Sequence, residues 1–185
     1  MSLAARIATP ALLADAPVTA QPLLAAVDQQ LGLVPNVVRV LARSPAALEG
    51  YLGLDGALGA GELDAKTRAR IALAVAEANA CDYGLSAHSY LGKYVALLDD
   101  ADIAANREGR STDARADAAV RFAAKIVTAR GHVTDADVLA VKAAGYSDPE
   151  VLEIVLHVAL NTLTSYVNEV ARTEIDFPIV AHHAK

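Results

Sequence analysis

Residues 64–88, DAKTRARIALAVAEANACDYGLSAH, decide the fold, because they predict two consecutive helices separated by a short break. Asp64 can cap the first helix, and its apolar run at 71–76 indicates a buried face. Residues 79–80 interrupt this helix, and a second helix is expected over about 81–98. The sequence therefore predicts a cysteine, Cys81, at the start of a helix.

Similar start and stop signals on both sides of this stretch predict further helices. The clearest start is Ser147-Asp148-Pro149-Glu150, which combines a cap, a first-turn proline and a glutamate at the third position. Thr134 with Asp137 makes a similar start, and Ser111 is a candidate cap. The expected helices cover roughly 19–31, a short segment after Pro35, 45–58, part of 99–110, 111–131, 134–145 and 149–173.

Length and composition favour one all-α domain. The chain has 185 residues, which is enough for one sizeable core. Its hydrophobic fraction is 54%, much of it helix-favouring alanine, whereas aromatic residues make up only 4%. We expect an extended arm at 1–18, a single helical domain at 19–178 and a tail at 179–185, in which His182 and His183 are solvated.

Charge and hydrophobic patterning exclude several classes of partner. The net charge is −6 and no Lys/Arg cluster stands out, which disfavours binding to nucleic acid or to anionic membrane surfaces. The longest apolar run, 71–76, is far shorter than the ~20 residues of a membrane-spanning helix. Pro10 and Asp15 interrupt the alanine-rich start, so we expect no signal peptide and a cytoplasmic location.

A weak internal echo suggests two related helical units. Apolar and aromatic residues between Ile71 and Tyr83 recur at a constant offset between Ile154 and Tyr166. Two units packed about a pseudo-twofold axis would explain the echo. The alternative is that two buried helices share the same apolar spacing.

Any chemistry is expected to centre on Cys81 and His88. Cys81 is the single cysteine, which excludes an intramolecular disulfide, and a helix start favours the thiolate and lowers the thiol pKa. His88 lies two turns further on, within ~20° of the same face but ~10 Å along the axis. Gly84 costs the helix ~1 kcal/mol relative to alanine, which is odd unless it makes room for something. The alternative is that Cys81 and His88 are ordinary core residues.

The segment resembles the motif of the AhpD-like alkylhydroperoxidase and carboxymuconolactone decarboxylase superfamily. That motif is C-x-x-C-x-x-x-H, usually with a tyrosine before the second cysteine, and residues in register with it are Cys81, Tyr83, Ser86, Ala87 and His88. Residues 71–79 and the end of the chain, with Gly145-Tyr146-Ser147 and Asp176-Phe177-Pro178, resemble the peroxidase-related branch. The resemblance spans about residues 20–178 and implies an all-α AhpD-like fold and a homo-oligomer, a trimer or a hexamer.

The motif is degenerate here, C-x-x-G-x-x-x-H, because Gly84 stands at the second cysteine. In AhpD-like enzymes the two cysteines form a redox disulfide, and the second one meets the peroxide. A glutamate twelve residues before the first cysteine relays protons with the histidine, and here that position is Ala69. The resemblance implies Cys81 and His88 as the surviving catalytic residues. Glu77 is a candidate replacement carboxylate, or else a surface residue.

Three functions are compatible with these residues. The first, which we prefer, is a peroxide-handling antioxidant oxidoreductase in which Cys81 becomes a sulfenic acid that an external thiol, or Cys81 of another subunit, reduces. The second is a cofactor-independent lyase that resembles carboxymuconolactone decarboxylases, with His88 as proton donor and a lactone as substrate. The third is a catalytically inactive member that serves in binding or assembly. We therefore expect an enzyme that acts on a small molecule.

Other polar residues support a site less strongly. Arg68 and Arg70 are candidates for the cationic pocket that a dicarboxylate lactone needs, or are simply solvated. Glu153 and His157, four residues apart on one helix, could hold a divalent metal together with His88, although a buried, hydrogen-bonded His157 is preferred. The sequence contains no nucleotide-binding glycine loop and no haem or flavin motif, so neither cofactor nor metal is expected.

Overall fold

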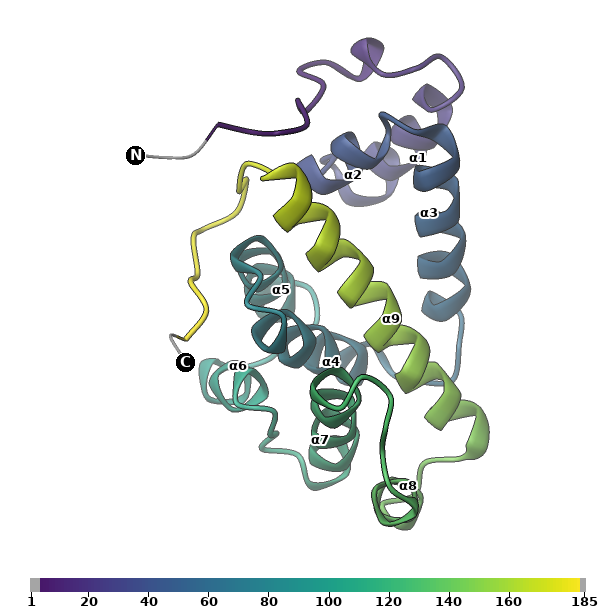
Figure 1. Cartoon of the computed structure of the whole chain (residues 1–185), viewed down its shortest axis with the longest axis vertical. Helices are drawn as coiled ribbons and strands as arrows, with labels where there is room; N and C mark the ends of the chain where they lie inside the picture. The colour runs from purple at the N-terminus through teal and green to yellow at the C-terminus, as the bar shows by residue number, and fades with distance from the viewer. Residues whose placement is uncertain (1–3, 184–185) are drawn as a thin grey trace.

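The computed structural model describes residues 4–183, and within them every regular element is helical (Figure 1). The all-α prediction is confirmed. The elements are the short 3-10 helix η1 (Leu13–Asp15) and the α-helices α1 (Gln21–Leu31), α2 (Asn36–Leu41), α3 (Pro45–Gly59), α4 (Ala65–Ala78), α5 (Asp82–Tyr94), α6 (Asp100–Arg107), α7 (Ala114–Thr128), α8 (Asp135–Ala143) and α9 (Asp148–Ala171).

Most predicted helix starts are confirmed by their caps. The Asp64 carboxylate accepts from the Thr67 N–H at 2.9 Å, and Ser147 forms a full capping box with Glu150. Two predictions were wrong. The helix from Cys81 ends at Tyr94 rather than near Leu98, and Asp113 rather than Ser111 caps α7.

Helix α4 lies at the centre of the bundle and packs against α5, α6, α7 and α9 (Figure 1). Its residues Ile71, Leu73 and Val75 are fully buried. Because α4 is in contact with helices on several sides, its apolar residues form a nearly continuous run rather than a single stripe. This buried helix fixes the position of the turn at 79–81 and hence of Cys81.

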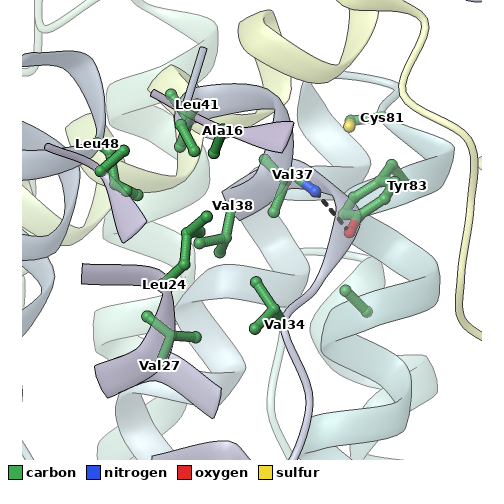
Figure 2. Packing of buried hydrophobic residues seen from close by; sticks show 13 residues of the cluster. Ala16, Leu24, Val27, Val34, Val37, Val38, Leu41, Leu48, Cys81 and Tyr83 are labelled. Carbon is green, nitrogen blue, oxygen red and sulfur yellow. Dashed lines mark hydrogen bonds between the residues drawn. The ribbon is translucent and has the colours of Figure 1, made fainter. Parts of the chain in front are cut away.

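A second core cluster joins the N-terminal helices to the start of α5. Figure 2 shows Leu24, Val37, Val38 and Leu41 packed together, with Cys81 and Tyr83 at the edge of the same cluster. The Val37 N–H donates to the Tyr83 hydroxyl at 3.1 Å. Residues 16–48 therefore bury the motif segment from one side.

The segment that follows α9, residues 174–183, lies along α5 and α4 and is called the C-terminal strap below (Figure 1, yellow). His182 and His183 are exposed, as predicted, but the segment that carries them is held against the helices by hydrogen bonds. The His182 N–H donates to Asp82 at 2.8 Å, and the His183 N–H donates to Glu77 at 2.6 Å. Residues 1–3 of the expected arm and 184–185 of the expected tail lie outside the described residues.

The two segments of the internal echo, α4 and α9, pack against each other. They differ in continuity, because α4 ends at Ala78 before α5 begins, whereas α9 continues without a break to Ala171. Among the described residues, no helix combines the length and the apolar character needed to cross a membrane.

Candidate functional site

Cys81 occupies the N-cap position of α5, where the sequence placed it. Its backbone is extended, and its Sγ accepts a hydrogen bond from the Gly84 N–H at 3.3 Å. On the other side the thiol points at the Ser165 carbonyl of α9, 3.9 Å away. The side chain is completely buried. Cys81 therefore sits between a helix N-terminus and the middle of the longest helix.

The prediction of a lowered thiol pKa was wrong in sign. Burial raises the pKa of Cys81 above its ordinary value, and the nearby charge of Glu169 adds to this. The Gly84 N–H and the side chains of Ser165 and Asn168 oppose the shift without reversing it. The helix start therefore does lower the pKa of the thiol, but the loss of hydration on burial raises it by more.

Position 84 retains the geometry of a two-cysteine site. A Cβ built on Gly84 would lie 3.7 Å from the Cys81 Cβ and 3.4 Å from its Sγ. Disulfides have Cβ–Cβ separations of ~3.5–4.5 Å, so the backbone already holds this pair at bonding distance. The same Cβ would approach the Ala76 Cβ to 3.1 Å, which is tight.

His88 is partly buried on α5, one turn beyond Gly84. Loss of hydration lowers its pKa to about 4, and a hydrogen bond with the Asn161 side chain opposes the shift only in part. The imidazole is therefore neutral at pH 7. It is a weak base with this pKa, and it is poorly suited to the proton-donor role expected for a lyase.

Glu77 is committed to structural contacts. Its carboxylate accepts from the Arg107 Nε at 2.7 Å and from the His183 N–H at 2.6 Å, and 11% of its side chain is exposed. These contacts join α4 to α6 and to the C-terminal strap. They leave Glu77 poorly placed as the replacement proton relay.

The strap closes the site through a network that the sequence did not predict. The Tyr83 hydroxyl donates to Asp176 at 2.8 Å, and Asp176 also accepts from the Asn36 N–H at 2.8 Å. Burial raises the pKa of Tyr83, so its hydroxyl stays protonated and donates. Phe177 packs edge-on against the Tyr83 ring. The Val180 N–H donates to the Ser86 hydroxyl at 2.9 Å.

The candidate metal ligands do not converge. Both oxygens of Glu153 accept backbone N–H groups, from Glu62 at 2.9 Å and Leu63 at 3.0 Å. His157 is buried, and its Nε2 has no hydrogen-bond partner among residues 4–183, contrary to the expectation of a bonded core histidine. Within the same range, no three His, Cys, Asp or Glu side chains are grouped to hold a metal ion.

The candidate cationic residues are engaged elsewhere. Arg70 forms a nearly buried ion pair with Asp102 at 2.8 Å, and Arg68 donates to the Leu63 carbonyl at 2.6 Å. Neither contact involves His88. The geometry thus gives little support to a lactone-binding pocket beside that histidine.

An open groove of about 850 Å³ lies next to Cys81. It is bounded by the arm at 4–6, the start of α5, the end of α9 and residues 172–175, and we call it the arm–α9 groove. Asn168 connects the two features, because it lines the groove and lies within hydrogen-bonding reach of the Cys81 thiol. Sequence reasoning did not connect Asn168 or Ser165 to Cys81, because they approach it only when α9 packs on α5.

Comparisons with known proteins agree with this geometry. The sequence model of the carboxymuconolactone decarboxylase family matches residues 45–129. No curated protein matches the chain in sequence.

Solved structures that share the fold include three proteins. One, from Ralstonia eutropha JMP134, is an uncharacterized peroxidase-related protein described as an alkylhydroperoxidase AhpD core (TM-score 0.82, 24% identity, 93% of this chain and 92% of that chain). Another is a peroxidase-related protein from Silicibacter sp. TM1040 (TM-score 0.77, 24% identity, 94% and 90%). The third is a Cys-to-Ala variant of the debrominase Bmp8 in complex with 2,3,4-tribromopyrrole (TM-score 0.79, 21% identity, 95% and 94%).

The matched residues 45–129 contain the whole α4–turn–α5 segment and its Cys81 and His88, and the fold is that of the AhpD core. Residues 45–129 therefore match the carboxymuconolactone decarboxylase family, and the chain has the AhpD-like fold.

Proposed function

We propose that this protein is a single-cysteine thiol oxidoreductase of the AhpD type, which reduces peroxides at Cys81 with electrons from an external thiol. The observation that carries the proposal is the position of the Cys81 Sγ. It accepts the Gly84 N–H at the start of α5, and position 84 lies at disulfide distance from it. The scaffold of a redox cysteine pair is thus retained around one remaining thiol.

The cycle balances with a peroxide and two equivalents of thiol. The Cys81 thiolate attacks one peroxide oxygen, the O–O bond breaks, and the products are a sulfenic acid and an alcohol or water. A first external thiol forms a mixed disulfide and releases water. A second thiol restores Cys81 and leaves as an external disulfide. Such a cycle needs a reducing environment, so we expect a cytoplasmic location and an antioxidant role.

The groups around the thiol have separable roles in this proposal. The Gly84 N–H supports the anionic sulfur, and the neutral His88 accepts a hydrogen bond from a bridging water through which the thiol proton leaves to solvent. Because burial raises the pKa of Cys81, only a small fraction is thiolate at pH 7. The rate should therefore rise about tenfold per pH unit until the thiol pKa is reached.

The test is peroxide consumption with added thiol by the wild type and two variants. Cys81→Ser is expected to abolish turnover, and His88→Ala to lower it by about 10²-fold. Turnover that survives in Cys81→Ser but not in His88→Ala would overturn the thiol proposal in favour of a lyase-type reaction at His88. Absence of turnover by the wild type would indicate a binding or assembly role.

The likeness to Bmp8 supports one further substrate class for the same assay. Bromopyrroles should be offered beside hydrogen peroxide and an organic hydroperoxide. Bromide release that requires Cys81 would assign the thiol to reductive debromination. If peroxides are not consumed in the same assay, this result would contradict the peroxide proposal.

A further inference from the structure

The arm–α9 groove contains buried polar atoms that lack partners. The Asn168 Oδ1 and the Thr173 Oγ1 have no hydrogen-bond partner within residues 4–183. Their residues are only 4% and 8% exposed, and both line the groove. An unsatisfied buried polar atom costs ~1–3 kcal/mol, so two of them beside one groove indicate that a ligand completes them.

The charges around the groove define what kind of ligand would fit. Arg6 and Arg172 line it, and no side chain among residues 4–183 forms an ion pair with either guanidinium. Glu169 and Glu174 supply negative charge on the same wall. A zwitterion with carboxylates, an ammonium group and amide N–H donors matches this pattern. The volume of about 850 Å³ lies within the ~300–1,000 Å³ of small-molecule sites.

The groove also lies next to the reactive sulfur. Asp82 and Tyr83, which line it, follow Cys81 directly in the chain. Asn168 lines the groove, and a hydrogen bond from its side chain counteracts the raised pKa of the Cys81 thiol. A ligand held by Asn168 is therefore one side chain away from Sγ.

We infer that the arm–α9 groove binds the reductant, a zwitterionic, peptide-like low-molecular-weight thiol. This inference rests on the proposed thiol cycle. The carboxylates of the thiol bind Arg6 and Arg172, and its N–H donors satisfy Asn168 and Thr173. Its sulfur forms the mixed disulfide with oxidised Cys81 and releases water, once the Asn168 side chain turns aside.

Binding is tested without redox chemistry. S-methylglutathione, which has the charged and amide groups but no free thiol, should bind the wild-type protein in isothermal titration calorimetry. Arg6→Gln and Arg172→Gln should each weaken binding about three- to tenfold. Arg130→Gln is the matched control, since Arg130 has the same left-handed backbone as Arg172 and is an exposed residue outside the groove. Absence of binding, or an equal loss in the control, would overturn the inference.

Thr173→Val separates ligand binding from folding. The variant keeps the side-chain shape and removes a buried hydroxyl that has no partner, so the thermal midpoint should stay constant or rise. S-methylglutathione affinity should nevertheless fall about fivefold. Unchanged affinity would show that Thr173 does not bind the ligand, which contradicts the proposed groove contacts.

A rate measurement connects the groove to Cys81. Glutathione should reduce the peroxide-generated Cys81 sulfenic acid at least tenfold faster than β-mercaptoethanol at equal thiolate concentration, and Arg172→Gln should remove most of this advantage. Equal rates for the two thiols would contradict the inference. If no sulfenic acid forms at all, the proposed function fails, whereas the calorimetric result still decides whether the groove binds the peptide-like ligand.

Discussion

At the residue scale, the contact between position 84 and Cys81 gives a direct prediction. Gly84→Cys should form a disulfide with Cys81 on oxidation, because the two Cβ atoms would be 3.7 Å apart. Thiol-dependent peroxide reduction should rise by at least tenfold. The loss of 2 Da on oxidation, seen by intact mass, and the assay of peroxide consumption check both parts.

Gly84→Ala is the matched control for this substitution. It adds the same Cβ, with the same 3.1 Å approach to the Ala76 Cβ, but no thiol. Its stability should change by less than about 1 kcal/mol, because the gain in helix propensity offsets the tight contact. A gain of activity in Gly84→Ala, or no disulfide in Gly84→Cys, would show that the pair geometry is not what limits the site.

The position of Cys81 could be predicted from the sequence, whereas its electrostatics could not. The cap position follows from the local break at Asn79 and Ala80, which neighbouring residues determine. The raised pKa depends on burial and on the charge of Glu169, and it is opposed by Ser165 and Asn168, all three residues being more than eighty positions away in the chain. The position of Cys81 at a helix start accounts for the effect of the local dipole on its pKa, but not for the burial of the thiol against α9.

At the element scale, the C-terminal strap is expected to control access to Cys81. Asp176 accepts from both Tyr83 and Asn36, so Asp176→Ala removes two hydrogen bonds and leaves the buried Tyr83 hydroxyl short of a partner. The free energy of unfolding should fall by about 2 kcal/mol. Cys81 should react several-fold faster with a maleimide, followed by mass spectrometry.

Asp28→Ala on the exposed side of α1 is the control for the loss of a carboxylate. It should change neither the unfolding free energy nor the maleimide rate. An unchanged maleimide rate in Asp176→Ala would mean that the strap does not limit access to the thiol.

Helices and strap differ in how far local sequence determines them. The caps of α4, α8 and α9 are formed by residues three positions apart, so the pattern alone predicts them. The strap is ordered by bonds such as Asp176–Tyr83 and His183–Glu77, which join residues about a hundred positions apart. No local pattern encodes such partners, so the sequence predicted an exposed tail but not its hydrogen bonds to α4 and α5.

At the scale of the whole molecule, acid stability should depend on buried histidine. Burial lowers the pKa of His157 from about 6.5 to about 4, so the unfolded chain takes up the proton first as the pH falls. The stability that neutral His157 provides is complete above pH 6.5 and is lost as the pH falls toward 4. The loss from this residue is about 3 kcal/mol, measured by urea unfolding at several pH values.

His157→Leu should make this pH dependence shallower and leave the part due to His88, because one of the two histidines with a lowered pKa is removed. His132→Gln, which replaces an exposed histidine, should leave the dependence unchanged. An equally steep fall of stability in His157→Leu would assign the acid sensitivity to other groups.

The exposed face of α9 leads us to expect a homo-oligomer, as the family resemblance implies. Leu152, Leu156, Leu163, Tyr166 and Val170 are exposed at spacings typical of a helix-packing seam. Leu163→Glu should therefore shift the sedimentation coefficient toward that of the monomer. Leu139→Glu on α8 replaces an equally apolar, 66% exposed leucine outside this face and should not. A monomeric wild type would contradict the expectation.

The pH dependence of Cys81 oxidation tests the single-thiol account most directly. Peroxide-treated protein is trapped with dimedone from pH 6 to 10, and Cys81→Ser serves as the blank. The account predicts one adduct, at Cys81, whose rate of formation rises about tenfold per pH unit and is still rising above pH 8.5, the ordinary cysteine value. An unmodified Cys81 across this range would contradict the account and remove the chemistry from the thiol.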